Sequence, residues 1–61
     1  MNQTIKRIRT QAFLTQAEFA KAIGVSASAV GKWELGLFKP SLRQQAKIVA
    51  FCKEKGIEYK D

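Results

Sequence analysis

The side chains able to do chemistry in this sequence are mostly cationic. Residues 1–53 contain nine lysines and arginines but only two acids, Glu18 and Glu34, within a formal net charge of +6 for all 61 residues. Residues 54–61 carry three acids and two lysines. A positive body of this kind favours a polyanionic partner, most simply a nucleic acid, while a solvated basic surface is the alternative interpretation.

The sequence contains no set of residues typical of a catalytic or metal site. It has no histidine and a single cysteine, Cys52, so zinc sites and imidazole-based catalysis lack their usual ligand and base. Three of the five carboxylates lie near the C-terminus, and the four glycines are too far apart to form a phosphate-binding loop. We therefore expect no enzyme activity, metal, cofactor or small-molecule substrate.

Length and composition predict one small cytoplasmic domain over residues 1–61. Cys52 has no partner for a disulfide within the chain, which fits a reducing compartment, and we expect it to pack rather than react. No apolar run approaches the roughly 20 residues that cross a bilayer, and the polar start MNQTIKRIRT is unlike a secretory signal. We expect no membrane partner.

Helical spacing of apolar residues predicts a helix at each end of the chain. The first begins near Asn2 to Thr4 and has a stripe of Ile5, Ile8 and Ala12, after which Phe13 and Leu14 are expected to turn inward. Pro40 keeps residues 37–40 in a loop. The last helix is predicted from Ser41 to Gly56, with residues 57–61 as a short extended tail. Its predicted apolar set is Leu42, Ala46, Val49 and Cys52.

The most informative stretch is QAEFAKAIGVSASAVGKWEL, residues 16–35. Thr15 and Glu18 fit a capping box for a short helix that ends at Gly24. Ser26 then caps a further helix that closes at Gly36. The residues predicted to face inward from these two helices are Phe19, Ala20, Ile23, Val30 and Trp33.

Two helices joined by so short a turn must cross steeply, and the small Ala20 suits the point where they touch. Val25 fills the corner, and Trp33 is predicted to be a core anchor rather than a base-stacking platform. The pattern is that of a helix-turn-helix, whose second helix is carried on the surface and can enter a major groove.

From Ile5 to Val49 the sequence resembles the Cro/phage-repressor helix-turn-helix family, often called XRE-like. The phrases TQAEFAKAIGVSASAVGKWELG and KPSL carry this resemblance. It implies an all-α fold, a compact bundle of four or five helices with the motif at residues 16–35. It also implies a small transcriptional regulator, a repressor, that binds double-stranded DNA sequence-specifically through a recognition helix at about residues 26–35. Family members usually bind palindromic operators as homodimers.

The resemblance also assigns roles to individual positions. It implies a phosphate contact for Gln16, and further contacts to the DNA backbone for Lys39 and Arg43. It implies a buried ion pair between Arg9 and Glu34. The base-contacting positions that it implies are Ala27, Ser28, Gly31 and Lys32. Helix geometry independently places residues 27, 28, 31, 32 and 35 on one face, opposite Val30 and Trp33.

This reading face carries little side-chain information. Lys32 is its one long donor and suits guanine O6 and N7, Ala27 suits a thymine methyl group, and Ser28 is ambiguous between bases. The absence of a side chain at Gly31 has two interpretations. It lets the helix approach the groove closely, or it has no role in binding and either relieves packing or is merely tolerated. We therefore expect DNA shape or bridging water to contribute to specificity.

Apolar residues outside the predicted core leave a second function open. Leu37 and Phe38 lie in a loop that is usually polar, and we expect them at a dimer contact or in local burial. Phe51 and Tyr59 are further candidates for dimer contacts. The alternative function is a protein-interaction module on the same fold, an antitoxin or anti-regulator, with weak or no DNA binding.

Overall fold

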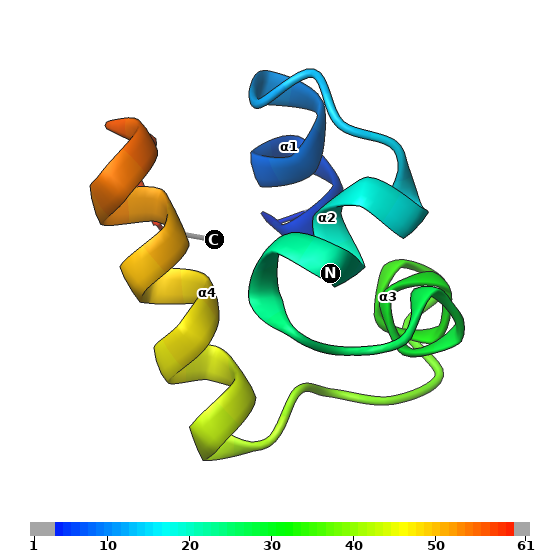
Figure 1. Ribbon diagram of the computed structural model, residues 1–61. Helices are drawn as coiled ribbons and strands as arrows, with labels where there is room; N and C mark the ends of the chain where they lie inside the picture. The colour runs from blue at the N-terminus through cyan, green and yellow to red at the C-terminus, as the bar shows by residue number, and fades with distance from the viewer. Residues whose placement is uncertain (1–3, 60–61) are drawn as a thin grey trace.

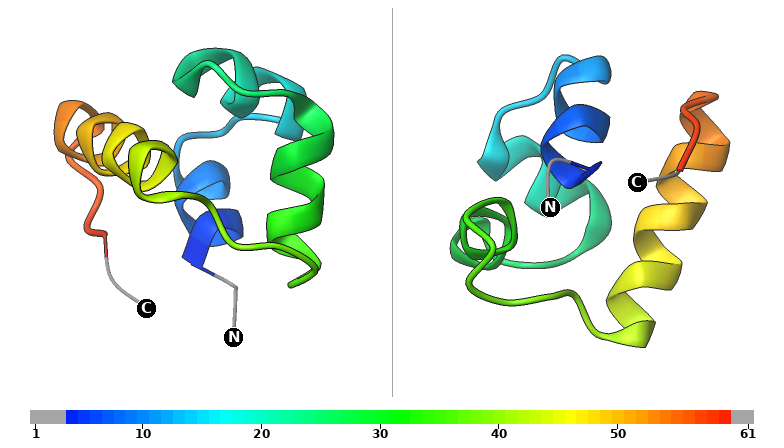
Figure 2. Two further views of the ribbon diagram at one scale, coloured as in Figure 1. Left: turned by 90° about the horizontal axis from the view of Figure 1, so that it is seen from below. Right: turned by 180° about the vertical axis from the view of Figure 1, so that it is seen from behind.

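The computed structural model describes residues 4–59, which form four helices and no strand. The helices are α1 (Thr4–Gln11), α2 (Gln16–Ile23), α3 (Ala27–Glu34) and α4 (Leu42–Lys55). The helices α3 and α4 lie on opposite sides of the molecule, with α1 and α2 between them (Figures 1 and 2). The predicted all-α class is confirmed.

Side-chain caps start three of the helices. The Thr15 hydroxyl accepts a hydrogen bond from the backbone N–H of Glu18 (3.1 Å), and the Glu18 carboxylate accepts one from the N–H of Thr15 (2.8 Å). The Ser26 hydroxyl accepts from the N–H of Ala29 (3.1 Å). A second capping box joins Ser41 and Gln44 at the start of α4. These caps fix where α2, α3 and α4 begin because they satisfy N–H groups that have no partner within the helix.

All four helices end in the same backbone turn. In each, an N–H beyond the helix returns to the carbonyl five residues before it: Leu14 to Arg9, Val25 to Ala20, Leu37 to Lys32 and Ile57 to Cys52, at 2.8–3.2 Å. This Schellman turn needs a residue with positive φ just before the returning N–H. Glycine takes that position in three of the turns, and Phe13, with φ of 59°, takes it after α1.

The inward turn expected at Phe13 is wrong. Its side chain is 92% exposed, whereas Leu14 is half-buried and packs against the core as expected. The left-handed backbone at Phe13 brings the following residue back onto the helix, and that residue makes the apolar contact typical of this turn. The aromatic ring consequently remains in solvent.

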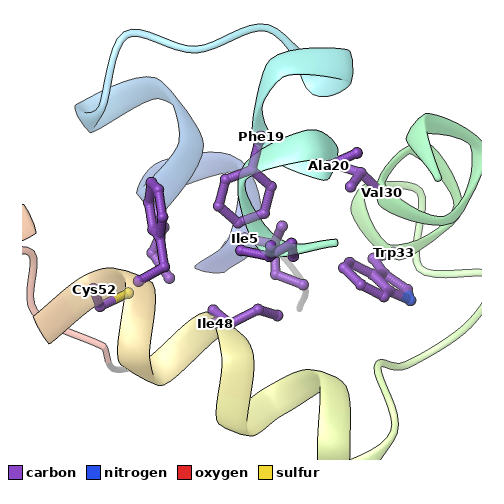
Figure 3. Packing of buried hydrophobic residues seen from close by; sticks show 10 residues of the cluster. Ile5, Phe19, Ala20, Val30, Trp33, Ile48 and Cys52 are labelled. Atoms are coloured by element: carbon purple, nitrogen blue, oxygen red, sulfur yellow. The ribbon is translucent and has the colours of Figure 1, made fainter. Parts of the chain in front are cut away.

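The core gathers side chains from all four helices (Figure 3). Phe19 lies at its centre. The Phe19 ring packs edge-on against the ring of Phe51, with centroids 5.1 Å apart. Trp33 and Ala20 are buried as predicted, so Trp33 is a core anchor. The buried set is Ile5, Ile8, Phe19, Ala20, Ile23, Val30, Trp33, Ile48, Phe51 and Cys52.

The predicted inner face of α4 is confirmed at Cys52 and wrong in register at its other three residues. Ile48, Phe51 and Cys52 are buried, whereas Leu42 is 84% exposed and Ala46 and Val49 are also exposed. The true inner face begins with two glutamines that make local bonds: Gln44 caps the helix, and the Gln45 amide donates to the Pro40 carbonyl (3.0 Å). Because these inner positions are polar, the spacing of apolar residues does not identify the inner face of α4.

The burial of Phe51 also corrects its expected role. At 6% exposure its ring belongs to the core, so it presents no surface for a dimer contact. After α4, Ile57 packs against the core and the Glu58 carbonyl accepts a hydrogen bond from Arg7 (3.0 Å). The cap candidate Asn2 and residues 60–61 of the predicted tail lie outside the described residues.

Replacing Phe13 by glycine should stabilise the protein. A non-glycine residue in the left-handed region costs about 1–2 kcal/mol, part of which glycine gives back through its greater freedom in the unfolded chain. We expect Phe13→Gly to raise the free energy of unfolding by about 0.5–1 kcal/mol in urea titrations.

The matched control is Gly56→Ala, because a Cβ there would meet no atom within 4 Å and so tests backbone conformation alone. We expect it to lower stability by about 1 kcal/mol. Equal stability of Phe13→Gly and Phe13→Ala would contradict this account.

Candidate nucleic-acid interface

The turn between α2 and α3 leaves one side of α3 at the edge of the molecule. Gly24 ends α2 in the left-handed conformation, and Ser26 caps α3 two residues later. Figure 2 shows α3 lengthwise at the edge of the bundle, on the side away from α4. Val30 and Trp33 bury the opposite side of α3 in the core. The helix is therefore anchored along one side and uncovered along the other.

The uncovered side of α3 carries the residues predicted to read bases. Ala27, Ser28 and Lys32 are exposed, and Gly31 is half-buried. Leu35, which directly follows the helix on the same face, is exposed as well. The structure thus brings the predicted reading positions together on one surface.

Gly31 does not relieve a steric clash. A Cβ at this position would lie 3.6 Å from Oε1 and 4.0 Å from Nε2 of Gln16, which is ordinary van der Waals contact. Alanine therefore fits without displacing a neighbour. Relief of packing therefore loses its support as an explanation of Gly31, whereas close approach to a groove and simple tolerance are both compatible with this geometry.

An ion pair joins the first and third helices. Arg9 Nε donates to Glu34 Oε2 (2.7 Å) and Arg9 Nη2 donates to Glu34 Oε1 (3.1 Å), so the contact is bidentate. Arg9 Nη1 also donates to the carbonyl of Leu14 (3.0 Å). The two side chains are only 14% and 7% exposed. One carboxylate and one guanidinium therefore fix α1, the turn after it and α3 relative to one another.

Gln16 belongs to the same network. Its Nε2 donates to Glu34 Oε1 (3.0 Å), so the first residue of α2 is bonded to the last residue of α3. An amide nitrogen carries two N–H donors, and one of them is used here. The exposed Gln16 side chain keeps the other at the N-terminus of α2, where the helix dipole favours an anion.

The network lowers the pKa of Glu34. Burial alone raises this pKa, but hydrogen bonds from Arg9 and Gln16, with the charges of Arg9 and Lys6, outweigh that effect. The bond to Glu34 in turn raises the pKa of the Arg9 guanidinium. Glu34 is consequently ionised throughout the neutral range.

The cations expected beside the DNA backbone lie after α3. Lys39 is exposed in the loop that leads to α4, and Arg43 is exposed in the first turn of α4. Within residues 4–59 neither side chain has a hydrogen bond or an ion pair. Both positive charges are therefore available to a partner.

Lys32 makes a contact that sequence reasoning missed. Its Nζ lies over the ring of Phe38, 5.4 Å from the centroid. Phe38 and Leu37 are exposed, as is Tyr59, so these three remain candidates for dimer contacts. Lys32 lies within α3 and Phe38 lies beyond its end, so helical periodicity does not predict that the two side chains meet.

A helix-turn-helix whose second helix is open on one side defines a class of nucleic-acid-binding proteins. The Cro/C1-type helix-turn-helix family, the XRE family, matches the chain over residues 5–59. The chain belongs to this family of DNA-binding regulators, as its resemblance implied. It matches no curated protein and no solved structure.

None of the helices between residues 4 and 59 is both long and apolar enough to cross a membrane. The same part of the chain brings together no three acidic, cysteine or histidine side chains in an arrangement able to hold a metal ion.

Replacing Glu34 by glutamine should cost stability in a pH-dependent way. A carboxyl whose pKa is lowered by folding stabilises the protein above its unfolded pKa, and this contribution disappears as the pH falls through the folded pKa. We expect Glu34→Gln to lower the free energy of unfolding by about 2 kcal/mol at pH 7. The difference in the free energy of unfolding between the wild type and Glu34→Gln should become smaller as the pH falls below about 4.3.

Urea titrations across pH 3–7 measure this difference. Glu54→Gln, which changes an exposed carboxylate on α4, is the matched control and should alter stability by less than about 0.5 kcal/mol. A gap between wild type and Glu34→Gln that does not change with pH would overturn the assignment.

Proposed function

We propose that this protein is a small transcriptional repressor that places α3 in the major groove of double-stranded DNA and reads its sequence there. The observation that carries the proposal is the uncovered face of α3, with Lys32 on it and Gln16, Lys39 and Arg43 on the segments before and after it. In this proposal Ala27, Ser28, Gly31 and Lys32 meet base edges. Gln16, Lys39 and Arg43 meet phosphates, where charge governs affinity.

The size of α3 supports binding as a homodimer. Its eight residues span about 12 Å, similar to the width of the major groove, so one protomer contacts only a few base pairs. Two copies related by a two-fold axis would read a palindromic operator. We propose Leu37, Phe38 and Tyr59 as dimer contacts because all three are exposed.

Repression by occlusion is the simplest consequence of this binding, since a protein seated on an operator blocks access to it. The site of action would be the cytoplasm, where the DNA of a bacterium or of an infecting phage lies. The lone thiol of Cys52 is buried, which is compatible with that reducing compartment.

Selection of duplexes from a random pool tests the proposal. We expect enrichment of a palindrome whose half-sites are one helical turn apart, about 10 base pairs between centres. Enrichment of no sequence, together with no binding to any duplex at low salt, would contradict it.

That outcome would favour the second candidate function, a protein-interaction module. The observation in its favour is the concentration of exposed large apolar residues in the segment 35–42, which contains Leu35, Leu37, Phe38 and Leu42. Exposed apolar groups at this density are typical of protein contacts.

Replacing Lys39 by alanine should weaken binding to all duplexes alike. A lysine on phosphate carries no sequence information, so its loss changes affinity and salt dependence but leaves the preferred sequence intact. Measured by fluorescence anisotropy, the slope of log K against log salt should become shallower by about 1 for each protomer.

Lys53→Ala is the matched control, because Lys53 lies on α4, on the other side of the molecule from α3. It should leave the slope within error of the wild type. Equal slopes for Lys39→Ala and wild type would remove Lys39 from the interface.

A further inference from the structure

We propose that Phe38 positions Lys32 for base reading, so that a residue outside the recognition helix sets the base preference of the one long donor on its face. This inference rests on the proposed function, since it concerns how α3 reads DNA. Phe38 is a positioning residue here because it acts through the Lys32 ammonium.

The turn after α3 brings the two side chains together. The Leu37 N–H returns to the Lys32 carbonyl (3.0 Å), and Gly36 supplies the left-handed residue that this turn requires. The chain therefore doubles back at the end of α3. It leaves Phe38 beside Lys32, with the ammonium 5.4 Å from the ring centroid.

The contact restrains a side chain that is otherwise mobile. Lysine carries its charge on four flexible carbons and loses much rotamer freedom on binding. The face of an aromatic ring attracts a cation, and the ammonium has three N–H donors, so it can lie over the ring and still donate to guanine O6 or N7. A restrained ammonium pays less of the ordering cost when it meets a base.

Restraint of Lys32 affects base reading strongly because the other residues of the reading face offer few hydrogen-bonding groups. Ala27 and Gly31 have no polar side-chain atom, and Ser28 is short. Lys32 is therefore the residue of this face whose long side chain can distinguish bases by donating hydrogen bonds. The 59% exposure of Phe38 also acquires an explanation, since the ring serves the surface of the protein rather than its core.

Three variants separate the ring from its apolar volume. Phe38→Leu keeps an apolar side chain but removes the aromatic face, and Phe38→Tyr keeps the face. Phe13→Leu, the matched control, makes the same substitution at an exposed ring outside the proposed interface. Thermal unfolding followed by circular dichroism verifies that each variant folds, which the exposure of both sites favours.

The first measurement is made on the free protein. In the wild type, ring current should shift the NMR signals of the Lys32 ε-methylene protons upfield of those of the other lysines. The shift should vanish in Phe38→Leu and persist in Phe38→Tyr and Phe13→Leu. An unshifted Lys32 in the wild type would overturn the proposal.

The second measurement is selection of duplexes from a random pool with each variant and with Lys32→Ala. Phe38→Leu should relax the preference at the same base position in each half-site that Lys32→Ala relaxes. Discrimination there should fall by about two- to fivefold, and Phe38→Tyr should restore it. Phe13→Leu should keep the preference of the wild type at that position.

The remaining outcomes distinguish the two proposals. If the wild type selects a clear operator and Phe38→Leu selects the same one with undiminished preference, the role of Phe38 is overturned and the proposed function stands. If Phe38→Leu alters half-site spacing alone, Phe38 acts only as the proposed dimer contact, and its positioning role is overturned. If the wild type binds no duplex, both proposals fail.

Discussion

The arrangement of this protein depends on one carboxylate. Glu34, the last residue of α3, accepts two hydrogen bonds from Arg9 on α1 and one from Gln16 at the start of α2. These three helices are short, and each could shift on an apolar core that has no directional preference. Directed, charge-assisted bonds restrict such shifts. The angle at which α3 presents its uncovered face thus follows from where Glu34 is held.

The contribution of this network is mainly geometric. Taking a carboxylate and a guanidinium out of water costs free energy that offsets much of their attraction. The apolar core, centred on Phe19, supplies the favourable term, and Val30 and Trp33 extend it beneath α3. Gln16 then connects the internal network to the surface, because its amide is bonded to Glu34 while its side chain remains exposed.

Local signals made the motif predictable from sequence. The caps at Thr15 and Ser26 and the glycine at position 24 fix the two central helices through hydrogen bonds within a few residues. The inner face of α4 was not predictable in the same way. Its first turn places Gln44 and Gln45 toward the bundle, and their local bonds to Ser41 and Pro40 replace the apolar contacts that a periodic pattern requires.

The exposure of Phe13 and the contact between Lys32 and Phe38 depend on backbone geometry that cannot be predicted from residue type. Phe13 occupies a left-handed position that glycine takes in the other three turns, so its ring turns outward although an aromatic residue suggests burial. The contact between Lys32 and Phe38 arises because the turn at Gly36 reverses the chain. The predicted surface position of Phe51 is wrong because the predicted register of α4 is wrong. Base-reading and phosphate-binding roles, by contrast, depend on a partner and stay predictions.

Every proposed contact to a base depends on the uncovered face of α3 meeting DNA. Amide NMR shifts of the isotope-labelled protein, recorded while a duplex is added at low salt, locate the surface that the DNA contacts. Non-specific binding is sufficient, because it uses the same charges on phosphate. We expect the largest changes at Gln16, Ala27, Ser28, Gly31 and Lys32, with small changes on the outer side of α4. If the largest changes fell on α4 beyond its first turn, which carries Arg43, or if no residue changed, that result would exclude this contact.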